Sequence, residues 1–307
     1  MKKNLAQIKP YLRWFIWGGV LFFLIKTVKD RWGEVATIKI DAQGWLMLAL
    51  ALTITICAHI WSGWVWTWIL RLFRQTLGTK EGIRVYLVTN IAKYSPGNIW
   101  HYYGRINAVS RTGGSKGAAA LSVLLEPLLM ASAALLIGLI GSGLGLLETN
   151  FNLTIVLLQL FALVAVLTGI HPRILNPLMQ RLSRSKNKGE TRATQFITLP
   201  SYPIIPFLGE IGFVLLRGCG FLFTFLALQS ISGQQIPQLI SAFSFAWLLG
   251  LVVPGAPGGL GVFEVTAYGL LDDSLFPAEI AAVALYRLIS ILAEAIAAAA
   301  SIKKIYV

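Results

Sequence analysis

The sequence predicts an all-α polytopic membrane protein, in which six transmembrane helices and two opposed re-entrant helical hairpins form an inverted repeat. Three observations support this prediction. Hydrophobic residues make up 56% of the 307 residues and charged residues only 13%, too few to cover the surface of a soluble domain of this length. Six apolar runs approach or exceed the length needed to cross a bilayer. Two further apolar segments are interrupted near the middle by Pro-Gly.

The expected spans follow from the apolar runs, because a spanning helix needs about 20 such residues. The candidates lie at 11–28, 45–70, 117–140, 152–170, 203–230 and 279–301. The first run is the shortest, and no small-residue cleavage site follows it, so we expect a retained span rather than a removed signal peptide. The whole chain, 1–307, is then a single membrane domain.

Lysine and arginine set the expected orientation. The N-terminus, loop 71–84, loop 173–192 and the C-terminal tail carry these cations, whereas loops 141–151 and 231–238 carry none. Because cationic loops remain in the cytoplasm, we expect both termini and the cytoplasmic loop 173–192 inside, in a plasma membrane of the bacterial type. Segment 29–41 does not fit this rule, since it places three cations on the expected outer side.

Segments 83–109 and 239–271 are expected to be re-entrant hairpins. In each case, the span before the segment ends on the side where the span after it begins. The arm Val85–Ser95 would form roughly 16 Å of helix, which reaches only the middle of a bilayer. The chain then contains two units, about 45–140 and about 203–301, with the same order of elements and opposite direction. This arrangement is the inverted-topology repeat of many secondary transporters.

Residue spacing inside the two units supports the repeat. Glu126 follows Pro96 by 30 residues, and Arg287 follows Pro257 by the same interval. Each hairpin also carries a charge opposite to that of its following span, and the order of arginine and glutamate is reversed between the units. The expected structural ion pairs are Arg105–Glu126 and Glu264–Arg287.

A lipid headgroup site is expected where the two hairpin tips meet. After each Pro-Gly a half-helix begins near the midplane, and its free N–H groups and positive dipole end favour an anion. Arg217 is a further intramembrane charge, which Glu210 on the same helix face is placed to neutralise. The candidate headgroup-binding residues are Lys93, Pro96, Gly97, Asn98, Arg105, Arg217, Pro257, Gly258, Gly259 and Gly261. A purely architectural role for the ion pairs and glycines is the alternative.

Two stretches point to a family. KYSPGNIWHYYGR, from Lys93 to Arg105, and VPGAPGGLGVFE, which ends at Glu264, resemble signatures of the lysylphosphatidylglycerol synthase transmembrane family, the flippase-like membrane domain. The resemblance covers about residues 10–303. The residues that carry it are Lys93, Pro96, Gly97 and Arg105 in the first motif, Pro257, Gly258, Gly259, Gly261 and Glu264 in the second, and Glu126 after the first hairpin.

The resemblance implies a helical membrane protein that handles polar lipids. In the aminoacyl-lipid synthases, this region moves the modified phospholipid between leaflets, and a soluble aminoacyl-transferase domain follows it. The present sequence ends at Val307, so we expect a stand-alone member without that domain and without lysyl transfer. Other stand-alone members are associated with glycosylated lipids, polyprenyl-linked sugars or hopanoids, so the lipid is not named by the resemblance.

The expected function is lipid translocation, with membrane lipids as partners. One alternative is a non-catalytic membrane partner of a lipid-modifying enzyme such as a glycosyltransferase, and another is a membrane transferase. No catalytic motif or metal-ligand spacing involves His59, His101 or His171, so we expect no catalytic residues, metal or cofactor. The 26 Lys and Arg against 13 Asp and Glu are typical of cytoplasmic loops, so nucleic acid is not an expected partner.

Overall fold

The computed structural model describes residues 40–95, 98–143, 153–177, 198–253, 256–271 and 278–302. These ranges contain helices and no strands. The labelled helices, with η for 3₁₀, are α2 (Ala42–Leu72), α3 (Thr79–Asn90), η1 (Ile91–Tyr94), α4 (Trp100–Arg111), α5 (Lys116–Gly143), α6 (Leu153–Gly169), α8 (Ile204–Leu226), α9 (Gln235–Val252), η2 (Pro257–Gly259), α10 (Val262–Leu270) and α11 (Glu279–Ile302). The expected span 11–28 and most of loop 173–192 lie outside the described residues.

Five helices in the described ranges are long and apolar enough to cross a membrane: α2, α5, α8, α9 and α11. Four of them, all except α9, match predicted spans within a few residues. The predicted span 152–170 corresponds to α6, whose 17 residues are at the lower limit of the length that can cross a bilayer. The all-α membrane class is therefore confirmed, and the number of six full spans stays a prediction.

The second hairpin differs from the predicted one in the length of its first arm. The arms of the first hairpin, α3 and α4, have 12 residues each, as expected for helices that stop near mid-bilayer. In the second hairpin α10 has 9 residues, but α9 has 18, about 27 Å of helix. Helix α9 therefore has nearly the length of a full span, and the return of this segment to its side of entry stays a prediction.

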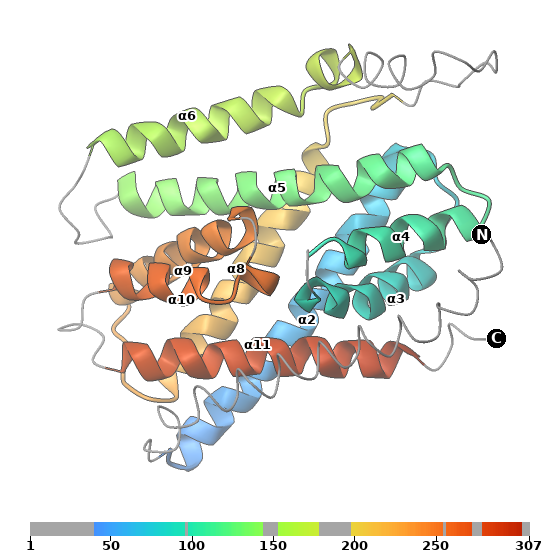
Figure 1. Ribbon diagram of the computed structural model, residues 1–307. Helices are drawn as coiled ribbons and strands as arrows, with labels where there is room; N and C mark the ends of the chain where they lie inside the picture. The colour runs from blue at the N-terminus through green and yellow to red at the C-terminus, as the bar shows by residue number, and fades with distance from the viewer. Residues whose placement is uncertain are drawn as a thin grey trace, which may run out of the picture.

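The two hairpins face each other inside the molecule. Figure 1 shows α5 (green) and α11 (red) at opposite sides, with the α3–α4 hairpin and the α9–α10 hairpin approaching each other between them. The tips touch, because η1 contacts η2. The two units also make matching contacts. Helix α2 packs on α3 and α11, and its counterpart α8 packs on α9 and α5. Likewise α3 packs on α11, and its counterpart α9 packs on α5. These equivalent contacts support the predicted relation between the units.

Glycines allow α2 and α8 to approach closely at the centre. A Cβ atom added at Gly209 would lie 2.7 Å from Cγ2 of Val65. One added at Gly220 would lie 2.5 Å from Oγ1 of Thr55. The indole N–H of Trp61 donates to the Gly209 carbonyl at 2.8 Å, so the contact is polar as well as tight. Small residues at such contacts let helix backbones pack closely, which drives helix association in membranes.

We expect Gly209→Ala to destabilise the protein by about 1–3 kcal/mol, because the added methyl group forces α2 and α8 apart. Thermal unfolding of the detergent-purified protein should show this as a lower Tm. Gly169→Ala is the matched control, since no atom lies within 4 Å of a Cβ added there. Equal Tm values for the two variants would contradict the close helix contact.

The re-entrant topology can be tested by labelling in a cysteine-free background. Single cysteines at Gly78 and Lys116, which flank the first hairpin, should react from the same side of the membrane, because that hairpin returns to its side of entry. Those at Gly233 and Ala278, which flank the second, should share the opposite side. Labelling of either flanking pair from two different sides would show that the hairpin between them crosses the membrane.

Candidate functional site

The first hairpin is attached to the helix that follows it by a buried ion pair. Arg105 of α4 donates through Nη1 to Oε2 of Glu126 of α5 at 2.6 Å, and both side chains are 2% exposed. The same guanidinium donates to Oδ1 of Asn90 at 3.3 Å, and its central carbon lies 3.7 Å from the ring centroid of Tyr86. A buried cation requires such compensation, because the apolar interior does not screen its charge. The first ion pair expected from the sequence is therefore present.

A second buried ion pair fixes the other hairpin at its tip. Arg287 of α11 donates through Nε to Oε1 of Glu264 at 3.0 Å, and through Nη2 to the Gly258 carbonyl at 3.0 Å. Glu264 also accepts the backbone N–H of Gly261 at 2.8 Å, directly before α10 begins. This expected pair is present too, but it changes one expectation. The Gly261 amide is occupied by Glu264, so it is not directed at a ligand.

The tip glycines bring the two hairpins into contact. Gly258 and Gly259 have φ values of 60° and 73°, in the left-handed region that side chains disfavour. A Cβ at Gly258 would lie 2.5 Å from the Tyr94 ring of η1, and one at Gly259 would lie 2.8 Å from the carbonyl oxygen of Gly250. A side chain at either position would therefore strain the backbone, so both glycines have an architectural role whatever else they do.

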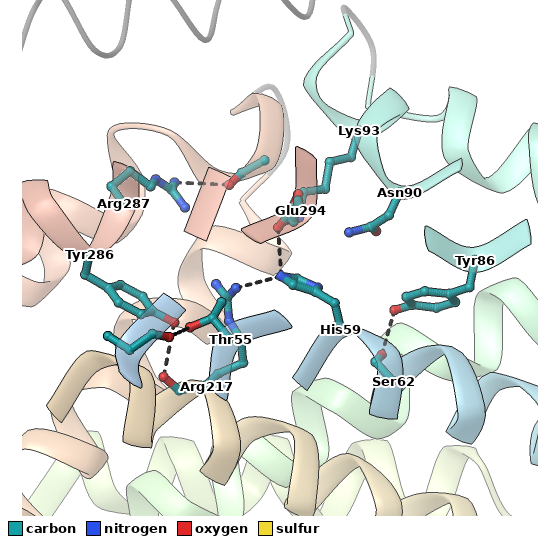
Figure 2. A network of polar contacts seen from close by, with 12 residues as sticks. Thr55, His59, Ser62, Tyr86, Asn90, Lys93, Arg217, Tyr286, Arg287 and Glu294 are labelled. Carbon is teal, nitrogen blue, oxygen red and sulfur yellow. Dashed lines mark hydrogen bonds and ion pairs between the residues drawn. The ribbon is translucent and has the colours of Figure 1, made fainter. Parts of the chain in front are cut away.

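A second polar network joins the first hairpin tip to α11, α2 and α8 (Figure 2). Lys93 of η1 lies with its Nζ 2.6 Å from Oε1 of Glu294 in α11. The same carboxylate oxygen is 3.4 Å from Nε2 of His59 in α2, and that nitrogen is 3.0 Å from Nη1 of Arg217 in α8. Neither Glu294 nor His59 was predicted from the sequence to lie in the site. The sequence did offer a signal for both residues: each is a polar group within an apolar span, where burial is costly and therefore indicates a function.

Arg217 has no carboxylate within ion-pair distance among the residues that the structure describes. Its side chain is 4% exposed, and its Nε has no hydrogen-bond partner. Its guanidinium carbon lies 5.4 Å from the ring centroid of Tyr286. The expectation that Glu210 neutralises Arg217 is wrong, because Arg217 bonds to His59 instead. Both carboxyl oxygens of Glu210 are buried without a hydrogen-bond partner in the described structure.

These side chains surround a cavity of about 120 Å³ where the hairpin tips meet. The volume suffices for several water molecules or one phosphate-sized group. Six residues that line it hold buried polar atoms without a hydrogen-bond partner in the described ranges: Asn98, His101, Arg105, Arg217, Ser290 and Glu294. Buried polar atoms normally have partners. The cavity is therefore suited to a polar occupant.

Most of the candidate headgroup residues lie around this cavity. Those that line it are Lys93, Asn98, Arg105, Arg217, Gly258 and Gly259. Pro96 and Gly97 lie outside the described residues, Pro257 begins η2, and Gly261 directly precedes α10. In the described part of the chain, no group of three His, Cys, Asp or Glu side chains is placed to hold a metal ion.

Glu126→Ala should lower the unfolding free energy by about 3–5 kcal/mol, because it leaves Arg105 buried without a counter-charge. The double variant Arg105→Met/Glu126→Leu should recover most of this loss, since no unpaired charge remains. Thermal unfolding in detergent measures all of these variants.

The control for this cycle is Glu81→Ala. Glu81 pairs with Arg84 at 3.8 Å, but the two side chains are 41% and 32% exposed. The loss of an exposed pair should cost less than about 1 kcal/mol. If Glu81→Ala and Glu126→Ala were equally destabilising, burial would not be what makes the Arg105 pair important.

The comparison with known proteins agrees with the helical membrane fold. The family described as the lysylphosphatidylglycerol synthase TM region matches residues 12–298, a range that includes both hairpins, both ion pairs and the cavity. No curated protein matches the chain. Because the family match covers most of the 307 residues and the family is a transmembrane domain, the protein is an integral membrane protein that belongs to the lysylphosphatidylglycerol synthase transmembrane-region family.

Proposed function

We propose that the protein moves an anionic lipid between membrane leaflets, with the lipid headgroup passing through the cavity between the hairpin tips. The observation that carries this proposal is Arg217, a buried guanidinium that lines the cavity and contacts no carboxylate in the described residues. Membership of the family supports the coarser statement of a membrane protein with a lipid-related function.

The balance of charges around the cavity favours a negatively charged occupant. Arg105, Arg287 and Lys93 each have a carboxylate oxygen within 3.0 Å, which leaves the charge of Arg217 without a direct counter-charge among the described residues. An uncompensated cation in an apolar interior is costly, and a bound anion removes that cost. A guanidinium binds phosphate oxygens through parallel N–H bonds, so a phosphate-bearing headgroup is the best chemical match.

The position of the cavity suits a translocation path. A headgroup that crosses about 30 Å of hydrocarbon must exchange its water contacts for protein contacts on the way. Asn98, His101 and Ser290 line the cavity with polar atoms that have no hydrogen-bond partner in the described ranges, and these atoms can supply such contacts. The acyl chains can remain in the surrounding lipid if the cavity opens sideways, which is part of the proposal. A membrane partner without transport activity would have no need of an uncompensated cation at this position.

Arg217→Gln should slow movement of an anionic lipid about 10- to 100-fold, the expected effect of losing hydrogen bonds to a charged group. The assay uses proteoliposomes with fluorescent NBD-phosphatidylglycerol and dithionite quenching from outside. NBD-phosphatidylcholine, whose headgroup has no net charge, should be affected less. Arg84→Gln is the matched control, because Arg84 is partly exposed and does not line the cavity.

Two outcomes would contradict the proposal. If the wild-type protein moves neither lipid, the role of a non-catalytic partner for a lipid-modifying enzyme becomes the better interpretation. If Arg217→Gln slows both lipids equally while its Tm falls, Arg217 stabilises the fold rather than selecting an anionic headgroup.

A further inference from the structure

We propose that the headgroup site also binds a proton, at Nε2 of His59, and that the proton crosses the membrane together with the anionic lipid. This inference rests on the proposed function and adds a driving force to it. It follows from the surroundings of one atom. Nε2 of His59 lies 3.0 Å from Nη1 of Arg217 and 3.4 Å from Oε1 of Glu294 (Figure 2).

One imidazole nitrogen cannot bond to both of these neighbours in the same protonation state. Arg217 keeps its positive charge in proteins and has only N–H donors, whereas the carboxylate of Glu294 is an acceptor. An unprotonated Nε2 accepts the hydrogen bond from Arg217, and no hydrogen then lies between His59 and Glu294. A protonated Nε2 donates to Glu294. It can then no longer accept a hydrogen bond from Arg217, because both groups are donors. The shorter distance to Arg217 fits the unprotonated form.

Uptake of one proton therefore releases Arg217. The proton adds to the lone pair of Nε2, and the new N–H group donates to Oε1 of Glu294. Nη1 of Arg217 loses its acceptor, and Nε has no hydrogen-bond partner in the described structure. The guanidinium is then free to bind a phosphate oxygen in the cavity. The step consists of a proton transfer to His59 and a change of hydrogen-bond partners.

The exchange of hydrogen-bond partners at His59 depends on the charged groups that surround its imidazole. The charged groups that face the buried imidazole are Glu294 from α11, Arg217 from α8 and Lys93 from η1. Two other helices pack against α2, and their nearby polar groups are already engaged. Tyr86 of α3 bonds to Ser62 at 2.6 Å, and Glu126 of α5 is paired with Arg105. Lys93 holds Glu294 in place from the first hairpin tip, so the exchange connects that tip to α8.

Charge balance couples the proton to the headgroup. With His59 neutral, Lys93, Glu294 and Arg217 carry one net positive charge between them. A proton adds a second positive charge, and a phosphate monoanion cancels it, so joint binding leaves the net charge of the buried site unchanged. The bound proton attracts the anion, and the bound anion offsets the charge that the proton adds, because opposite charges interact strongly in a low-dielectric site. By linkage, each ligand strengthens the binding of the other, and a lower pH tightens headgroup binding.

The transport test uses the full chain in proteoliposomes with NBD-phosphatidylglycerol and an imposed pH gradient. In the wild type, lipid movement should be several-fold faster when the proton gradient runs in the same direction than when it is reversed. His59→Gln places a non-titrating amide near the position of Nε2, so it should remove this difference. His171→Gln is the matched control, because His171 follows α6 and does not line the cavity.

A binding test does not depend on transport. Short-chain phosphatidylglycerol added to the protein in detergent should raise Tm, and the affinity follows from its concentration dependence. One linked proton tightens binding by up to about tenfold for each pH unit lowered. His59→Gln should flatten this dependence. Glu294→Gln should do so as well, because it weakens the acceptor for the protonated imidazole, so the test does not rely on the folding of one variant.

The outcomes separate the two proposals. If the wild type moves the lipid equally under both gradients and its affinity does not change with pH, the proton proposal is overturned and the proposed function stands. A gradient response that persists in well-folded His59→Gln also overturns it. If the wild type neither moves nor binds phosphatidylglycerol, the proposed function fails, and this inference fails with it.

Discussion

Charge buried in an apolar interior is costly unless it is compensated, and this constraint attaches both hairpins to the rest of the described structure. Arg105 and Glu126 tie α4 to α5, and Glu264 and Arg287 tie α10 to α11, so each hairpin is attached to the helix that follows it. Separating either pair would leave a buried charge without a partner. A hairpin and its following helix are therefore expected to move as one body in any opening of the cavity. The two bodies meet at their tips, where η1 contacts η2.

The predicted repeat relates the helices of the two halves but not the charges of the site. Equivalent positions in the two units are 161 residues apart, as Pro96 and Pro257 show. At this interval the network residues correspond to uncharged ones: His59 to Gly220, Lys93 to Pro254, Arg217 to Ile56 and Glu294 to Ala133. The predicted symmetry thus applies to the two hairpin tips, whereas the polar network between them is asymmetric. The proposed passage of a single headgroup through the centre would require one set of binding groups and not two.

Stability and function place opposite demands on the residues at the tips. Gly258 and Gly259 permit close contacts with Tyr94 and Gly250, which a side chain at either position would prevent. These contacts hold the tip of the second hairpin in place. The same closeness confines the cavity to about 120 Å³. A bulky headgroup therefore requires the tips to separate. Glu210, whose carboxyl group has no hydrogen-bond partner in the described part of the chain, does not line this cavity, and nothing in that part explains it.

The sequence by itself determined most of the helices and the two ion pairs that attach the hairpins. Apolar runs specify helices because a bilayer leaves no other partner for backbone polar groups, and Pro-Gly marks the tips because it interrupts those helices. Arg105 and Glu126 were predictable because their helices follow each other directly in the chain. The length of α9 could not be predicted, because the hydropathy of its first turn does not differ from that of the preceding loop.

Only the tertiary structure decided which intramembrane charges meet. Glu210 and Arg217 lie on one helix face by spacing, yet Arg217 bonds to His59, and Glu294 from the last helix completes the network. These contacts depend on how each helix is rotated about its axis and where it crosses its neighbours. Side-chain packing between distant segments sets both quantities, and no local pattern of residues records them.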